Sequence, residues 1–206
     1  MRYLLTVVGL MCLGVFTIST TSANTIERYV AGVHYKIVAP EPSKTKTPHV
    51  LSFFSYACPH CNHLEPAVDK WRKGLSSNVV FERVPAQWSP LFKSMARFYY
   101  ALDGLHLADQ HSQAVFDEIH KKKRSLDMEG SILAFVQTLG LDKAKFQQAL
   151  NSDAVKKKMR KGKGVMTQYK IPGVPSFVVN GRYFVNVSMA GSPEQLFEVL
   201  DFLLTK

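Results

Sequence analysis

The chain has 206 residues, of which 46% are hydrophobic and 20% are charged, and its formal net charge at pH 7 is +10. This length and composition allow a hydrophobic core of its own, which excludes a disordered chain or a small domain that depends on disulfide staples. The excess positive charge is concentrated at 121–124 and 156–163. No aromatic residues are interleaved with these basic runs, so we interpret them as a solvated helix face with its loop and expect no nucleic-acid partner.

The first 23 residues have the pattern of an export signal. Arg2 precedes an apolar stretch at 4–18, and small residues at 21–23 allow cleavage after Ala23. The apolar stretch is shorter than the roughly 20 residues that span a membrane, which disfavours an uncleaved anchor. A lipid-modified Cys12 is disfavoured because a bulky methionine precedes it. We therefore expect an exported protein.

Once the signal is removed, the mature chain keeps two cysteines, Cys58 and Cys61. A structural disulfide framework in an exported domain uses more pairs and longer loops. Two residues between the cysteines close a very small loop, for which stabilisation by loop closure is weakest. The pair is therefore expected to have a chemical role.

The first half of the mature chain predicts strands and one helix. A short extended segment and a connector rich in proline and lysine precede a β-rich run, and the helix begins directly after the cysteine motif. In chain order the segments are an extended stretch at 34–38, the connector at 40–48, a strand at 49–54, a helix from Pro59 to Gly74 and a strand at 78–84. A strand, a helix and a second strand form the βαβ unit of a parallel sheet.

The second half is first helical and then returns to strands. Ser89-Pro90 is a good N-cap and first helical residue, and Asn180-Gly181 is a strong hairpin-turn signal. The expected segments are a helix from Pro90, helices at 105–120, 131–139, 142–150 and 153–169, strands at 177–179 and 183–185, and a last helix from Ser192-Pro193 to Leu203. This order predicts a three-layer α/β domain interrupted by an all-helical insertion.

Cys58 lies where the strand is expected to end and the helix to begin. The free N–H groups and the positive end of the helix dipole stabilise a thiolate there, and the thiolate is the attacking species in disulfide exchange. His60 adds positive charge or a hydrogen-bond donor. We expect Cys58 to form the mixed disulfide with substrate and the more sheltered Cys61 to resolve it. A stabilised Cys58 thiolate favours the reduced protein, which makes the disulfide an oxidant.

A second motif, Ile171-Pro172-Gly173-Val174-Pro175-Ser176-Phe177, precedes the hairpin. A proline just before a strand cannot donate to the sheet, and a cis bond at Val174-Pro175 exposes the preceding backbone in a tight turn. If this turn lies against the Cys58 end of the helix, the backbone of Val174 can pair with a substrate peptide. A simple turn before a strand is the alternative.

Together these motifs resemble the DsbA family of dithiol oxidases in the thioredoxin superfamily. The matching residues are Phe53-Phe54-Ser55-Tyr56-Ala57-Cys58-Pro59-His60-Cys61 and Gly173-Val174-Pro175-Ser176-Phe177-Val178-Val179-Asn180-Gly181. The resemblance implies an α/β thioredoxin-like fold with an inserted all-helical domain and a cis Pro175. It divides the chain into a signal peptide at 1–23, a first thioredoxin-like part at 24–88, the helical insertion at 89–170 and a second thioredoxin-like part at 171–206.

The resemblance also implies a function in the periplasm. It implies an enzyme that oxidises reduced, unfolded exported proteins and is itself reoxidised by a membrane quinone-linked thiol oxidase. We expect a monomer, because nothing in the sequence demands a dimer, and no cofactor. Pro59, His60, Val174 and Pro175 support the Cys58–Cys61 disulfide. Many relatives carry a buried acid in the strand before the motif, where this chain has Ser52. Proton transfer near Cys61 then falls to water or to Glu65, for which an ordinary helix acid is the alternative.

Four other functions are alternatives. Zinc or copper at Cys58, His60, Cys61 and His63 is disfavoured because structural zinc draws on two separated ligand pairs. The remaining histidines are expected on the surface or in packing: His34, His49, His106, His111 and His120. A disulfide isomerase is disfavoured because about 25 residues of mature chain precede the fold, and those enzymes usually carry a dimerisation domain. A disulfide reductase and a peptide-binding chaperone that retains the motif stay open.

Overall fold

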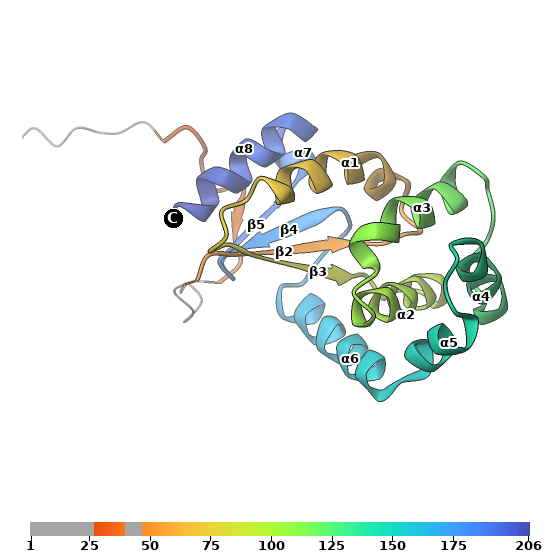
Figure 1. Ribbon diagram of the computed structural model, residues 1–206. Helices are drawn as coiled ribbons and strands as arrows, with labels where there is room; N and C mark the ends of the chain where they lie inside the picture. The colour runs from red at the N-terminus through yellow and green to blue at the C-terminus, as the bar shows by residue number, and fades with distance from the viewer. Residues whose placement is uncertain (1–26, 40–46) are drawn as a thin grey trace, which may run out of the picture.

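The structure is a computed structural model and describes residues 27–39 and 47–206, so the predicted export signal at 1–23 lies outside the described residues. Its elements are β1 (Lys36–Ile37), β2 (His49–Phe54), α1 (Pro59–Lys73), β3 (Val80–Pro85), α2 (Pro90–Gly104), α3 (Ala108–His120), α4 (Glu129–Thr138), α5 (Lys143–Asn151), α6 (Asp153–Gln168), β4 (Ser176–Val179), β5 (Tyr183–Asn186), α7 (Val187–Ala190) and α8 (Pro193–Leu204) (Figure 1). Within these ranges no helix is both long and apolar enough to cross a membrane.

The described strands form one mixed sheet in the order β1-β5-β4-β2-β3. β2 and β3 are parallel and α1 connects them, which confirms the predicted βαβ unit. β4 and β5 are antiparallel and joined at Asn180-Gly181, where both residues have positive φ, as the tight hairpin turn requires. Because β2 lies between β3 and β4, the loop that follows it leaves an interior strand of the sheet.

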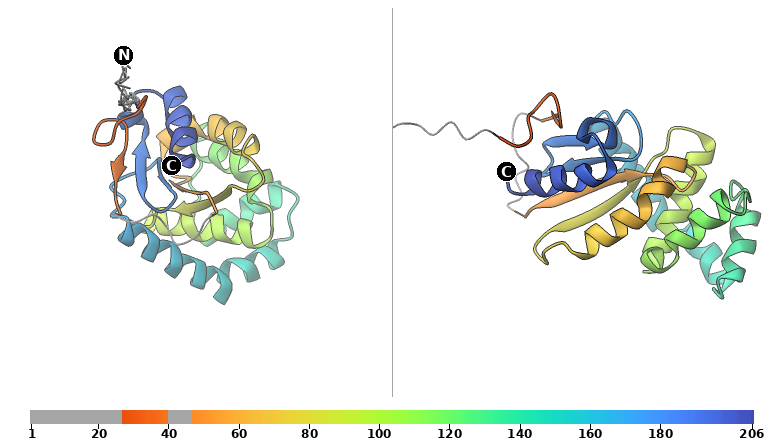
Figure 2. Two further views of the ribbon diagram at one scale, coloured as in Figure 1. Left: turned by 90° about the vertical axis from the view of Figure 1, so that its left-hand side faces the viewer. Right: turned by 90° about the horizontal axis from the view of Figure 1, so that it is seen from above.

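Helices cover both faces of this sheet (Figures 1 and 2). Side chains alternate along β2 because successive residues of a strand point to opposite faces. Val50 packs with residues of α1 and α8, whereas Leu51 and Phe53 pack with Met166 of α6. The thioredoxin-like part is therefore a three-layer α/β structure.

The inserted helices α2 to α6 build a separate core at the end of the sheet where the loop to α1 emerges (Figure 1). Phe98, Phe116 and Phe146 are buried in this core. Cys58 and Cys61 belong to the same hydrophobic cluster. The insertion therefore packs directly behind the cysteine motif.

Three local features differ from the sequence predictions. The strand expected at 34–38 is reduced to the two residues of β1, because Gly32 at φ 86° turns the chain just before it. The helix expected at 105–120 begins at Ala108, because His106 at φ 58° interrupts the helical backbone. The short helix α7 was not predicted; the side chain of Asn186 caps it by accepting a hydrogen bond from the N–H of Met189.

Candidate active site

Cys58 is the N-cap residue of α1, with an extended backbone (φ −92°, ψ 117°), and Pro59 follows at the first helical position. Pro59 has no N–H to satisfy, and its fixed φ suits the first turn of a helix. The N–H of Cys58 donates to the carbonyl of Ser55 at 3.1 Å. The sulfur of Cys58 therefore lies at the helix end where the free N–H groups point.

Both cysteines are in the thiol state in this structure. The pKa of Cys58 is lowered from 9.0 to about 6. The largest cause is the hydrogen bond from the Cys61 thiol; burial opposes the shift, and the backbone N–H groups of Cys61 and His60 and the charge of His60 add to it. Cys58 is thus the thiol that ionises near neutral pH.

Cys61 lies one turn further along α1 and behaves in the opposite way. It is 3% exposed, compared with 8% for Cys58. Burial raises the pKa of Cys61 far above its usual value, and the thiol of Cys58 raises it further. Cys61 therefore stays protonated when Cys58 is a thiolate.

The second motif lies against the first. The Val174-Pro175 bond is cis, as the resemblance implies. The thiol of Cys58 donates to the backbone carbonyl of Val174 at 3.5 Å, although 116 positions separate the two residues. The fold thus brings together Cys58, Cys61, Val174 and Pro175.

An open cleft of about 730 Å³ runs beside this site. Apolar side chains of α1, the Val174-Pro175 turn, α7 and α8 line it, including Leu64, Val187 and Pro193. His60 and His63 lie at its wall. The cleft offers an apolar surface next to the cysteine motif, with polar groups at its border.

Behind the motif lies a buried ion pair between Glu65 of α1 and Arg83 of β3, with Oε2 and an Nη atom 2.6 Å apart. Their side chains are 9% and 7% exposed. The guanidinium of Arg83 lies 4.8 Å from the centre of the Phe54 ring. Ser52 is the partner of Arg83 in the strand register, so the neighbour of this cation on β2 is neutral, and the carboxylate that pairs with it comes from α1.

Arg83 is a site residue that the sequence analysis did not identify. It lies between Glu82 and Val84 in a strand pattern, and a charged residue within that strand was the available signal. The four residues considered for zinc or copper do not gather: among the residues placed in the structure, no three His, Cys, Asp or Glu side chains form a group that can hold a metal ion. His60 and His63 instead line the cleft.

The comparisons with known proteins agree with this geometry. The family described as the DSBA-like thioredoxin domain matches residues 73–200. The thiol:disulfide interchange protein DsbA of Pseudomonas aeruginosa is 33% identical over 180 residues, which are 86% of this chain and 85% of the relative. The chain belongs to the DsbA family. The DsbA of Azotobacter vinelandii is 36% identical over 155 residues, which cover 75% of this chain and 72% of that DsbA.

Solved DsbA structures have the same fold. The crystal structure of Pseudomonas aeruginosa DsbA superposes with a TM-score of 0.81 at 32% identity and covers 86% of this chain and 93% of its own. Proteus mirabilis DsbA, solved with the non-covalently bound peptide PWATCDS, superposes with a TM-score of 0.70 at 26% identity and covers 87% and 100%. The resemblance stated from the motifs is confirmed, as are the thioredoxin-like fold with its helical insertion and the activity of a thiol:disulfide oxidoreductase.

Proposed function

We propose that this DsbA-family protein donates the Cys58–Cys61 disulfide to reduced, unfolded proteins that have been exported. The observation that carries the proposal is the opposite shift of the two thiols: the pKa of Cys58 falls to about 6 and that of Cys61 rises. A stabilised Cys58 thiolate stabilises the reduced enzyme, and a disulfide whose reduced form is stabilised is a strong oxidant.

The exchange proceeds in two steps. A substrate thiolate attacks the sulfur of Cys58, the Cys58–Cys61 bond breaks, and Cys61 leaves with the electron pair and takes up a proton. A second substrate thiolate then attacks the first substrate sulfur, and Cys58 leaves as a thiolate. The substrate loses two electrons and gains a disulfide, and the enzyme gains the two electrons. Cys58 is the favoured leaving group because a thiol of lower pKa leaves faster.

The substrate peptide lies along the cleft and the Val174-Pro175 turn. The carbonyl of Val174 lies 3.5 Å from the Cys58 sulfur, so a chain that pairs with this backbone places its cysteine at the reactive thiol. The apolar wall of the cleft suits the exposed hydrophobic side chains of an unfolded protein. The peptide bound to Proteus mirabilis DsbA supports a peptide as the occupant.

Glu65 acts on the proton of Cys61. The two residues are four positions apart on α1, which places them on the same face of the helix. The charge of Glu65 contributes to the raised pKa of Cys61. Since Ser52 is neutral, Glu65 is the acid closest in sequence to the cysteine pair, and water that reaches the pair shares the transfer with it.

The protein works as a monomer in the periplasm after cleavage of the signal at 1–23. The reduced enzyme passes its two electrons to a membrane quinone-linked thiol oxidase: Cys58 attacks a disulfide of that partner, and Cys61 resolves the mixed disulfide. The export pattern of the sequence and the family membership support this cycle.

The reduction potential of the Cys58–Cys61 pair, measured against glutathione, tests the direction of exchange. We expect a value well above about −270 mV, the potential of thioredoxin. A value near that of thioredoxin would contradict the oxidase and favour a reductase with the same fold. The Cys58→Ala/Cys61→Ala double variant tests the chaperone alternative, because a peptide-binding module without redox function keeps its activity in that variant.

A further inference from the structure

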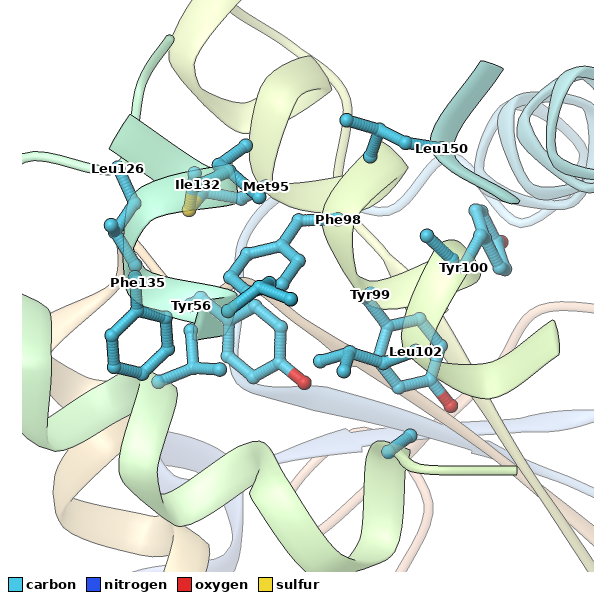
Figure 3. Packing of buried hydrophobic residues seen from close by; sticks show 14 of the residues in the cluster. Tyr56, Met95, Phe98, Tyr99, Tyr100, Leu102, Leu126, Ile132, Phe135 and Leu150 are labelled. Carbon is cyan, nitrogen blue, oxygen red and sulfur yellow. The ribbon is translucent and has the colours of Figure 1, made fainter. Parts of the chain in front are cut away.

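Tyr56, in the loop between β2 and α1, contacts the helical insertion through its side-chain hydroxyl and through its backbone carbonyl. Its hydroxyl and Oγ of Ser112 are 2.8 Å apart and share a hydrogen bond. Nε2 of His120, at the end of α3, lies 2.8 Å from the backbone carbonyl oxygen of Tyr56. Figure 3 shows the Tyr56 ring among residues of the insertion, beside Phe98. The insertion therefore contacts the residue two positions before Cys58.

The contact with His120 has a defined direction. A backbone carbonyl only accepts hydrogen bonds, so Nε2 of His120 carries the hydrogen and donates it. The imidazole ring stacks on Phe116, with centroids 6.1 Å apart and planes at 29°. The Phe116 ring in turn lies edge-on to Tyr56 at 5.1 Å. Packing therefore orients the donor toward the loop.

The basic run at 121–124 secures the helix end on which His120 lies. Glu118, whose side chain is 3% exposed, pairs with both Lys122 and Arg124 at 2.9 Å. Lys121 pairs with Asp117 at 3.0 Å. The run thus folds back onto α3, where three of its four basic side chains pair with two carboxylates of the helix.

Three hydrogen bonds fix the peptide groups that lead to Cys58. The peptide group between Tyr56 and Ala57 accepts from His120 at its carbonyl and donates from its N–H to Oγ of Ser55 at 3.2 Å. In the next peptide group, the N–H of Cys58 donates to the carbonyl of Ser55 at 3.1 Å. Two of these bonds lie within the loop, and the bond from His120 joins the loop to the insertion.

We propose that His120 is a positioning residue through which the helical insertion sets the reactivity of the Cys58–Cys61 pair. Without this donor the carbonyl of Tyr56 is left without its partner in a buried environment, which favours a shift of the loop. Such a shift moves the Cys58 sulfur away from the N–H groups of α1. The inference deepens the proposed function and rests on it, since Cys58 is taken as the thiol that substrates contact.

The test compares His120→Leu with His120→Gln in the full mature chain. The pKa of Cys58 is measured from the ultraviolet absorbance of the thiolate, and the reduction potential against glutathione. We expect His120→Leu to raise the pKa of Cys58 by about half a unit or more, roughly a threefold change in the ionisation constant, and to make the disulfide less oxidising. Gln places an amide N–H close to the position of Nε2, so we expect His120→Gln to keep the wild-type values.

Two further variants separate positioning from general stability. Ser112→Ala removes only the hydrogen bond of the Tyr56 hydroxyl, so it should lower the unfolding midpoint while the pKa of Cys58 stays unchanged. His120→Asn keeps a polar group that is too short to reach the carbonyl, so it should resemble His120→Leu and replaces it if the leucine variant does not fold. Wild-type pKa values in the Leu and Asn variants, or equal losses in Leu and Gln, would overturn the proposal. The reduction potential of the wild-type protein tests the proposed oxidase function. The differences between the wild type and the His120 variants test the role of His120, so the two proposals can fail separately.

Discussion

Cys58 and Cys61 lie within one turn of the same helix, yet the two ends of that turn give them opposite chemistry. The Cys58 end meets the cleft and the Val174-Pro175 turn, and the pKa of its thiol is lowered to about 6. The Cys61 end faces the core of the helical insertion, where burial raises the pKa of its thiol.

This difference shows that the spacing of two cysteines does not assign their roles. The hydrogen bond between the thiols contributes to both shifts, in opposite directions. The N–H groups at the start of α1 are directed toward the N-cap residue and away from the residue one turn later. Position relative to the helix end and burial therefore decide which sulfur attacks and which resolves.

Replacing each cysteine separately should have the largest effect, and it tests directly whether the two thiols differ in reactivity. Cys58→Ala should abolish both turnover and the formation of mixed disulfides. Cys61→Ala should also abolish turnover but keep the attack: it removes the hydrogen bond that contributes most to the lowered pKa of Cys58, but the backbone N–H groups of residues 60 and 61 and the charge of His60 still stabilise the thiolate. Non-reducing electrophoresis with a reduced substrate and an oxidant measures the trapped mixed disulfide. Equal trapping by the two variants would remove the difference between the thiols.

Removing the acid behind Cys61 should have the next largest effect. Glu65→Ala leaves Arg83 buried without its partner, so we expect a loss of about 3–5 kcal/mol in the free energy of unfolding, measured with urea. The matched control is Asp69→Ala, one turn further along α1, whose more exposed pairs with Arg72 and Lys73 should contribute below about 1 kcal/mol each.

The same position tests the proton relay. Glu65→Gln keeps a group that can accept a hydrogen bond from Arg83 but removes the carboxylate. We expect slower formation of the Cys58–Cys61 disulfide in single-turnover oxidation, with the alkylation rate of Cys58 unchanged. If Glu65→Gln forms the disulfide at the wild-type rate, Glu65 takes no part in transferring the proton of Cys61, and water alone transfers it.

The Cys58 end of the site could be predicted from the sequence because its determinants are local. A β-rich run, two cysteines and a proline at the first helical position define a strand-helix junction without any long-range information. The hairpin at Asn180-Gly181 and the caps at Ser89 and Ser192 are confirmed for the same reason.

The surroundings of Cys61 could not be predicted in the same way. Glu65 was named as a relay, but Arg83 lies 18 positions away and its pairing depends on the register of β2 and β3. His120 was expected on the surface or in packing, and it bonds a loop 64 positions earlier. Contacts between distant residues leave no periodic pattern in the chain, so only the assembled fold reveals them.

The lowered pKa of Cys58 predicts how the stability of the reduced protein and the reactivity of this thiol depend on pH. The folded pKa of Cys58 is depressed from 9.0 to about 6, so its contribution to the stability of the reduced protein is fully present above pH 9 and is lost as the pH falls through 6. We expect the unfolding midpoint of the reduced protein, relative to the oxidised one, to rise between pH 5 and pH 8. Alkylation of Cys58 should fall about tenfold per unit below pH 6. A difference in midpoint that is independent of pH would contradict the lowered pKa.

His60 should have the smallest effect, because its side chain is the weakest of the causes that lower the pKa of Cys58. His60→Leu removes the imidazole but keeps the backbone N–H of residue 60 and the thiol of Cys61. We therefore expect the pKa of Cys58 to rise by about one unit or less, measured by the pH dependence of alkylation. His63→Leu is the matched control, since His63 also lines the cleft without contributing to this pKa. A rise to the ordinary thiol value in His60→Leu would assign the asymmetry of the two cysteines to one side chain rather than to the helix end.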